Sequence, residues 1–359
     1  MKPSICLCMI VKDEESCICE CLESVKPIIS SWVISDTGSS DKTEEVIKNC
    51  LKNIPGNYSH DKWQDFSTNR NIALNLARKE RTDYILIIDA DDKLVINNLD
   101  EWGSLTEDTY NLIIKRGIIT YYRPQLIKSN LELNYIGILH EYLNVANNGI
   151  YLKNSYIDSS ANGSRSQDPL KYQHDAETFI KALKDDPTNS RYLFYCAQSF
   201  RDAGEKAKAL EYYLKRAEIT GWVEEDYIAL LEAGKLMAEI DIEKAENLYL
   251  TAHNKHGGRA EALCYLAKLF RAKNKFDKSY FYAVCASKII KPESALFLED
   301  ACYDWIPIDE MAVSGFYIGK KTESIMLNKK LLEELDVPEY HKPRIKDNLK
   351  LCIKLVCQR

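Results

Sequence analysis

The chain has 359 residues, of which 45% are hydrophobic and 28% are charged. These proportions are typical of an ordered globular protein, and the length exceeds what one hydrophobic core organises, so we expect two domains. A formal net charge of −6 argues against a nucleic-acid partner, which is bound by neutralising many phosphates.

The N-terminal segment and the cysteines bear on the cellular compartment. The first apolar stretch is interrupted by Lys12, Asp13 and Glu14, so it is too short for a signal peptide or a membrane span. We expect no membrane-spanning helix elsewhere in the chain. The twelve cysteines are unevenly spaced, and without a recognisable secretory signal they predict reduced thiols in a cytoplasmic protein.

Strand-like and helix-like segments alternate up to about residue 170. The predicted strand, helix, strand, helix, helix and strand cover, in this order, residues 4–11, 14–29, 32–36, 41–51, 67–79 and 84–89. Asp41 followed by Glu44 predicts a capping box at the start of the second helix. The alternation predicts an α/β domain with a mostly parallel, Rossmann-like sheet that has helices on both faces.

Cysteines cluster on the first predicted helix. Cys17, Cys19 and Cys21 follow Cys6 and Cys8 along the chain. Zinc sites usually present two C-x-x-C pairs, whereas the spacing on this helix is C-x-C-x-C. We therefore interpret these cysteines as small buried hydrophobic residues, with a metal site as the alternative.

Three aspartates follow the last of these strands. Asp89, Asp91 and Asp92 come directly after an apolar run that begins at Tyr84. Side chains two residues apart share a face of a strand, so Asp89 and Asp91 offer hard oxygen ligands in one direction. Such ligands suit Mg²⁺ or Mn²⁺, which keep positions open for phosphate oxygens. Asp36 ends the second strand, where ligands bind in this kind of sheet; an acidic turn without a ligand is the alternative.

The chain changes character near residue 170. Beyond that point strand patterns are almost absent, and Ala197, Ala233 and Ala267 follow one another at intervals of 36 and 34 residues. A period near 34 with small residues where helices cross is the tetratricopeptide pattern. We therefore expect an α/β domain over residues 1–170 and an all-α repeat domain over residues 175–359. Stacked repeats would form one curved core with a concave face.

Five segments resemble, in chain order, the motifs of a GT-A family 2 glycosyltransferase of the branch that carries a tetratricopeptide tail. These segments are ICLCMIVKDEE, ISDTGSSDKTEEVI, WQDFSTNRNIALNLA, YILIIDADD and ILHEYL. The repeats then open with RYLFYCAQSFRDAG, which that branch also shows. Many members of the family have Asn where this chain has Asp13, and Glu where it has Asp92. The resemblance spans nearly the whole chain, although residues 93–120 carry no assigned acceptor contact.

The resemblance implies roles for the residues that match its motifs. Asp36 would accept hydrogen bonds from the uracil or ribose of a UDP-sugar, with UDP-glucose or UDP-N-acetylglucosamine as the expected donor. Arg70 would lie by the base or its neighbouring aspartate, the alternative being an ion pair on a helix surface. Asp89 would contact the ribose. Asp91, with Asp89 and His140, would bind the Mn²⁺ or Mg²⁺ ion that bridges the two phosphates.

Sugar transfer with inversion requires a base for the acceptor's proton. His140 and Glu141 form the only His-Glu pair of the first domain. We assign Glu141 as the base and His140 to the metal or diphosphate site, although the two roles could be exchanged. A structural histidine under a loop is the alternative for His140.

The segment 162–175 is polar and lies between the expected domains. It is either a lid, in which Arg165 and Lys171 close over the diphosphate, or a solvated linker.

The sequence thus predicts a metal-dependent, inverting glycosyltransferase that acts on a peptide, protein or saccharide acceptor. The repeats would bind a peptide acceptor or form a homodimer. The alternative function is an inactive tetratricopeptide scaffold, against which the intact set of Asp36, Asp89, Asp91 and Glu141 argues. A nucleotidyltransferase would want a glycine-rich basic loop near the N-terminus, where residues 8–16 offer acids instead.

Overall fold

The computed structural model describes residues 2–116, 119–145, 149–159, 168–292 and 296–357. The chain divides into two compact units, Met1–His174 and Asp175–Arg359. The first is built on a β-sheet with helices, and the regular elements described in the second are all helices. The expected order of an α/β domain followed by an all-α domain is confirmed.

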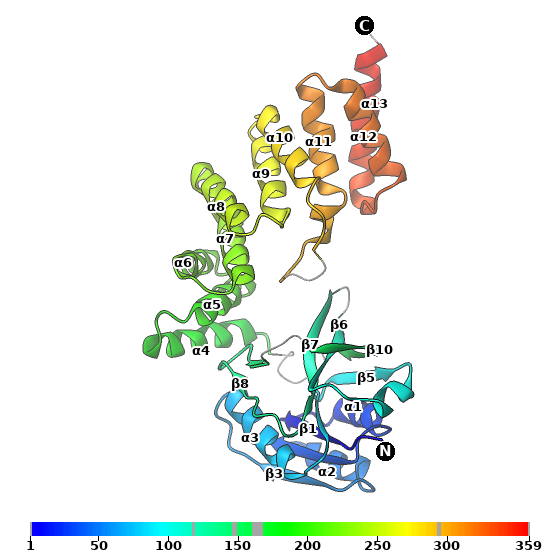
Figure 1. The fold of residues 1–359 in the computed structure, drawn as a ribbon. Coiled ribbons are helices and arrows are strands. Elements are labelled where there is room, and N and C mark those ends of the chain that lie inside the picture. Colours follow the sequence, from blue (N-terminus) through cyan, green and yellow to red (C-terminus); the bar gives the residue numbers. More distant parts are fainter. Residues whose placement is uncertain (1, 117–118, 146–148, 160–167, 293–295, 358–359) are drawn as a thin grey trace. The chain divides into compact units, whose positions relative to one another are not determined.

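One large sheet organises the first unit (Figure 1). Its strands, in spatial order, are β3 (Gly56–His60), β2 (Ser31–Asp36), β1 (Ile5–Val11), β4 (Tyr84–Ile87), β7 (Ile119–Lys128), β6 (Thr109–Arg116), β10 (Ile150–Ser159) and β5 (Asp92–Ile96). The first four are mutually parallel. Beyond them β7 runs antiparallel to both β4 and β6, and β10 runs parallel to β6 but antiparallel to β5. The sheet is therefore parallel over one half and mixed over the other, rather than mostly parallel.

Side-chain alternation along β1 builds two hydrophobic cores, one on each face of the sheet. The covering helices are α1 (Ile18–Val25), α2 (Thr43–Cys50) and α3 (Phe66–Lys79). Leu7 and Met9 are buried in one core with residues of α1 and α2, whereas Cys6 and Cys8 are buried in the other with residues of α3. Successive strand residues point to opposite faces, so an unbroken apolar run is required where both faces are covered.

The N-terminal ends of α1 and α2 differ from the prediction. Helix α1 begins at Ile18 rather than at residue 14, and the amide of Glu14 donates to Thr43 Oγ1 at 2.8 Å. The predicted capping box at Asp41 is wrong. Helix α2 begins at Thr43, whose amide donates to Asp41 Oδ1 at 3.0 Å, and Glu44 pairs with Lys48 at 2.5 Å instead of reaching back to the helix start.

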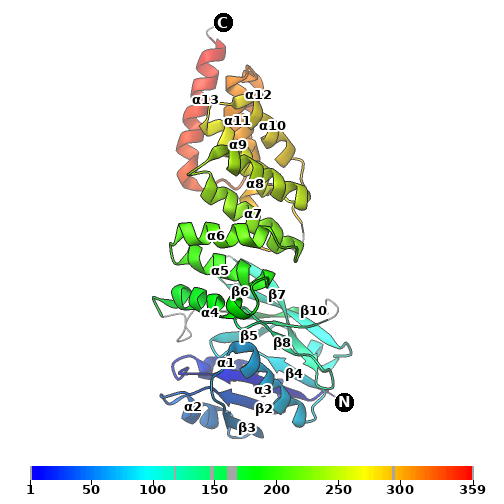
Figure 2. The ribbon, with the colours of Figure 1, turned by 90° about the vertical axis from the view of Figure 1, so that its left-hand side faces the viewer.

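From Lys171 onward the chain forms consecutive helices, and those from α5 to α13 pack against their neighbours in sequence (Figure 2). These are α4 (Lys171–Asp185), α5 (Ser190–Asp202), α6 (Lys206–Ala217), α7 (Val223–Met237), α8 (Ile242–Lys255), α9 (Glu261–Ala272), α10 (Phe276–Ala286), α11 (Ile306–Tyr317), α12 (Lys321–Glu333) and α13 (Lys342–Cys357). Gly204 and Asn274 turn the chain between paired helices with φ of 79° and 57°. Glycine and asparagine tolerate this left-handed conformation best.

Hydrogen bonds between neighbouring repeats join residues that are one period apart. Tyr227 Oη donates to Glu261 Oε2 at 3.1 Å, a separation of 34 residues, and Tyr265 Oη donates to Glu299 Oε2 at 2.9 Å with the same separation. Equivalent positions of stacked repeats therefore meet, as a repeat core requires. Among the described helices, none combines the length and the apolar character needed to cross a membrane.

Candidate functional site

Arg70 links two acidic residues from distant parts of the first unit. Its Nη2 lies 2.7 Å from Asp89 Oδ1, and its Nε lies 2.6 Å from Glu141 Oε1. The side chains of Arg70, Asp89 and Glu141 are 11%, 30% and 12% exposed. Arg70 comes from α3, Asp89 follows β4, and Glu141 precedes β9 (Tyr142–Leu143), which pairs with β8 (Tyr135–Ile136). Arg70 therefore forms ion pairs that are largely shielded from solvent, and its contact with a nucleotide stays a prediction.

A second arginine, Arg123, reaches the same aspartate. Its Nη2 lies 3.4 Å from Asp89 Oδ2. Burial raises the pKa of Asp89, but the guanidinium groups of Arg70 and Arg123 outweigh it and lower that pKa to about 2. Asp89 is therefore a carboxylate at any physiological pH. No sequence pattern indicates a role for Arg123, because its approach to Asp89 depends on β7 lying antiparallel beside β4.

Asp92 differs from Asp89, because its pKa is raised rather than lowered. Burial, the charge of Asp89 and, to a smaller extent, that of Asp91 raise the pKa of Asp92 to about 7. Burial is the largest of these causes, and the charge of Asp89 is the next. Carboxylate oxygens are preferred ligands of Mg²⁺ and Mn²⁺, so the chemistry of Asp89, Asp91 and Asp92 suits such a cation, and its binding there stays a prediction.

Asp36 organises the loop that follows β2. Its Oδ1 accepts hydrogen bonds from the amides of Gly38 at 2.8 Å and Ser39 at 2.7 Å, and Tyr58 donates its hydroxyl to Oδ2. Burial raises the pKa of Asp36, but the hydroxyl of Tyr58 and the two amides lower it below its ordinary value. Only 2% of Asp36 is exposed. It shapes the loop through these bonds, and a direct contact with a nucleotide stays a prediction.

The loops after β1 and β2 are hydrogen-bonded to each other. Asp13 Oδ1 accepts from the amide of Ser40 at 2.7 Å, and the amide of Asp13 donates to Ser39 Oγ at 3.0 Å. Asp13 has a φ of 54°, a conformation that aspartate adopts more readily than most residues. The carboxyl ends of β1 and β2 therefore form one connected rim beside the end of β4.

The positions of the remaining predicted site residues leave their roles as predictions. His140 is exposed, has a φ of 51° and precedes Glu141 in the turn before β9. Lys171 is half-buried at the first position of α4, so the predicted linker is already helical there. Arg165 lies outside the described residues. The lid role of Arg165 and Lys171 stays a prediction.

The three cysteines of the first helix point to three different environments. Cys21 is buried and its Sγ donates to the carbonyl of Asp89 at 3.4 Å, as expected for a small core residue. Cys17 is half-buried, with Sγ 3.2 Å from Glu14 Oε2. Cys19 is exposed, so its interpretation as a buried hydrophobic residue is wrong.

Comparison with known proteins relates the first unit to sugar transfer. Residues 6–100 match the sequence model of the Glycosyl transferase family 2. The matched segment contains β1 from its second residue and all of β2 to β5. It therefore includes Asp36, Arg70, Asp89 and Asp91, and it ends before Glu141. This match supports glycosyl transfer as the general chemistry and confirms the resemblance noted in the sequence.

Two curated relatives match different lengths of the chain. A TPR repeat-containing protein of Synechococcus elongatus is 36% identical over 102 residues, which is 28% of this chain and 23% of that protein. The SPbeta prophage-derived glycosyltransferase SunS of Bacillus subtilis is 25% identical over 243 residues, which is 59% of this chain and 53% of SunS. The chain thus spans about a quarter and about half of the lengths of these relatives. Among solved structures, MamA matches with a TM-score of 0.39 and 20% identity over 45% of this chain and 88% of that chain.

Proposed function

We infer that the first unit transfers a sugar from a nucleotide-sugar donor, a UDP-sugar, to an acceptor. The observation that carries this inference is the convergence of Arg70, Asp89 and Glu141 beside Asp91 at the carboxyl end of β4. Ligands of open α/β sheets bind outside the carboxyl ends of the strands. The family match over residues 6–100 covers most of this arrangement.

Asp91 and Asp89 are the proposed ligands of Mn²⁺ or Mg²⁺, with His140 or Asp92 as further candidates. When bound, the cation would supply positive charge to the leaving diphosphate. Arg70 and Arg123 already occupy both oxygens of Asp89, so Asp91 is the stronger candidate ligand. The two arginines would hold Asp89 in a fixed orientation toward the ribose.

Glu141 is the proposed base of an inverting transfer. Arg70 binds its Oε1 at 2.6 Å, which fixes the orientation of the carboxylate and leaves Oε2 to take the acceptor's proton. General base catalysis depends first on such positioning. His140, the preceding residue, could take this role if Glu141 only positions Arg70.

The acceptor is proposed to be a peptide, a protein or a saccharide. A repeat unit whose equivalent residues meet at intervals of 34 residues forms an extended concave surface, which suits a peptide chain. The same unit could instead form a homodimer. UDP-glucose and UDP-N-acetylglucosamine are the donors to test first.

Thermal unfolding with a panel of UDP-sugars, each with and without Mn²⁺, tests the donor and the metal together. A ligand that binds only the folded chain raises the unfolding midpoint by mass action. We expect one UDP-sugar to raise it only with Mn²⁺ present, and Asp91→Asn to abolish this shift. The matched control is Asp300→Asn, an exposed aspartate of the second unit. No shift with any donor would contradict the proposal and favour a scaffold without enzymatic activity.

The role of Glu141 is tested by Glu141→Gln. Glutamine keeps the shape of the side chain but takes no proton at neutral pH. We expect the variant to keep the donor-induced shift and to lose sugar transfer, measured as release of UDP in the presence of acceptor. Normal transfer by this variant would place the base at His140 or elsewhere.

A further inference from the structure

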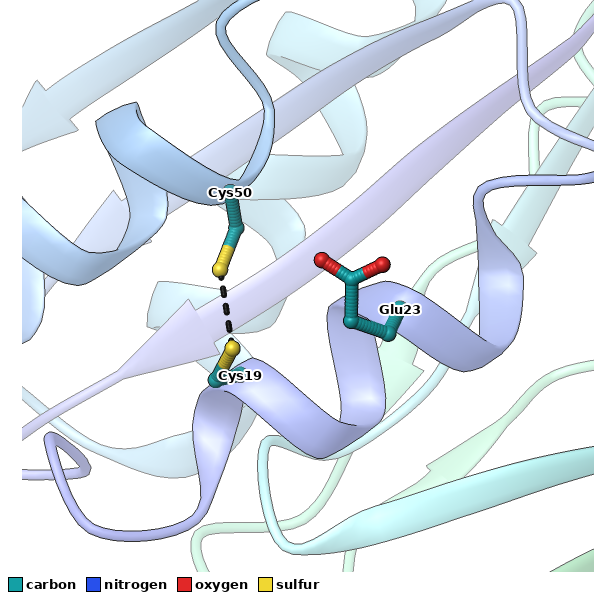
Figure 3. A group of neighbouring side chains, drawn as sticks. All are labelled: Cys19, Glu23 and Cys50. Carbon is teal, nitrogen blue, oxygen red and sulfur yellow. Dashed lines mark hydrogen bonds between the residues drawn. The ribbon is translucent and has the colours of Figure 1, made fainter.

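Two cysteines and a glutamate from helices α1 and α2 converge on the surface of the first unit. Cys19 lies in the first turn of α1, and Cys50 is the last residue of α2. Their Sγ atoms are 3.0 Å apart. Glu23 lies one helical turn beyond Cys19, and one ligand atom from each of the three residues lies within 4.8 Å of the others. Figure 3 shows the carboxylate of Glu23 beside the two sulfur atoms.

Local structure explains why these three residues meet. Residues four apart lie on one face of a helix, so Cys19 and Glu23 project together from α1. Helices α1 and α2 pack against the same face of the sheet, through residues such as Leu22 and Ile47. This packing places the end of α2, and hence Cys50, beside the exposed face of α1. Cys19 and Glu23 are exposed and Cys50 is half-buried.

We propose that Cys19, Glu23 and Cys50 bind a thiophilic divalent cation of the zinc class. Two thiolates select soft or borderline cations over Mg²⁺, and zinc sites in proteins accept sulfur and carboxylate ligands together. Three protein ligands leave the fourth tetrahedral position for water or another small ligand, and the exposure of the cluster gives that ligand access.

The geometry requires only a small adjustment. Zn–S bonds of about 2.3 Å in a tetrahedral site place two sulfur atoms roughly 3.7 Å apart, which is somewhat more than the observed 3.0 Å. Cys19 lies at the surface, so its side chain can move without disturbing the core. Glu23 also contacts Lys26 Nζ, and binding would leave one carboxylate oxygen for that lysine.

A disulfide is the competing use of the two sulfurs. A disulfide would require an oxidant and an S–S distance of about 2.05 Å. It would join only the two sulfur atoms and would not involve Glu23. The convergence of a third ligand on the pair favours the cation. Cation binding would join α1 to α2, whose preceding loops are already hydrogen-bonded through Asp13 and Ser40.

Cobalt titration of the reduced, chelator-treated full chain tests the proposal. Co²⁺ replaces Zn²⁺ at thiolate sites and gives a sulfur-to-metal absorption band, which carboxylate ligands alone do not give. We expect one Co²⁺ per chain with this band and displacement by Zn²⁺. Cys19→Ser and Cys50→Ser should lose the band, and Glu23→Gln should weaken binding by about tenfold or more.

Two controls separate this site from others. Cys285→Ser removes a half-buried thiol of the second unit and should leave the band unchanged. Asp91→Asn should also leave it unchanged, because the hard-cation site holds no thiolate. Zn²⁺ should raise the unfolding midpoint of the wild-type chain but not that of Cys19→Ser, with circular dichroism confirming that each variant folds.

Three outcomes would overturn the proposal. One is a thiolate band that persists in Cys19→Ser and Cys50→Ser, which would place the binding at other thiols. Another is unchanged affinity in Glu23→Gln. The third is no band at all, together with a loss of the mass of two hydrogens in the wild-type chain but not in Cys19→Ser after incubation with oxidised glutathione, which would identify the pair as a disulfide.

Discussion

Arg70 positions two carboxylates of the candidate site, because its guanidinium group binds both Asp89 and Glu141. Its Nε and Nη2 donate in directions fixed by the planar guanidinium, and lysine cannot reproduce this fork. We expect Arg70→Lys to lower the free energy of unfolding by about 1–3 kcal/mol, because Asp89 or Glu141 loses its partner. Urea unfolding measures this change. Lys93→Met, which removes an exposed ion pair with Glu20, is the control and should change little; equal effects of the two substitutions would contradict the role of Arg70.

Asp92 should make stability depend on pH. Burial and the charge of Asp89 raise its pKa from 3.8 to about 7. A carboxyl with a higher pKa in the folded chain than in the unfolded chain stabilises fully below the unfolded pKa, and this contribution is lost as the pH rises through the folded pKa. Without divalent cations, we expect the wild type to lose on the order of 2–4 kcal/mol relative to Asp92→Asn between pH 4 and pH 7. Urea unfolding at several pH values measures the difference. If the free energies of unfolding of the wild type and Asp92→Asn change equally with pH, Asp92 ionises normally.

At the scale of helices, the crossing of α7 and α8 depends on a glycine. A Cβ atom at Gly234 would lie 2.6 Å from the ring of Tyr249, which is 2% exposed. We expect Gly234→Ala to lower the free energy of unfolding by about 1–3 kcal/mol, because the buried ring has little room to move. Gly257→Ala, where the added atom would meet only His253 O at 3.8 Å, is the matched control. If both variants unfold at the same urea concentration, the crossing is looser than the structure shows.

Sequence patterns predicted strands that are buried on both faces. They missed side-chain contacts that depend on which strands or helices lie side by side in the fold. Strands β1 and β2 were predicted because both of their faces are covered, which requires unbroken apolar runs. The contact of Arg123 with Asp89 could not be predicted, because it depends on an antiparallel strand inserted beside β4. The pairing of Cys19 with Cys50 was likewise hidden, since their separation of 31 residues matches no local period.

At the scale of the whole molecule, the proposed site residues and the repeats lie in different units of the chain. Asp36, Arg70, Asp91 and Glu141 all belong to the unit Met1–His174. The unit Asp175–Arg359 is held by contacts between neighbouring helices and between equivalent residues of adjacent repeats. Repeat arrays of this kind are stabilised by nearest-neighbour contacts, so this unit does not depend on the sheet for its core.

This division predicts that a fragment of residues 168–359 folds by itself. The fragment keeps α4 intact, including Phe179, which is fully buried. We expect a helical circular dichroism spectrum and a cooperative thermal transition, because the helix pairs bury their apolar faces against one another. Its midpoint should not respond to any UDP-sugar with Mn²⁺, whereas that of the full chain should. A fragment without a cooperative transition would show that the repeats need the sheet, and a fragment that responds to the donor would move part of the donor site into the helical unit.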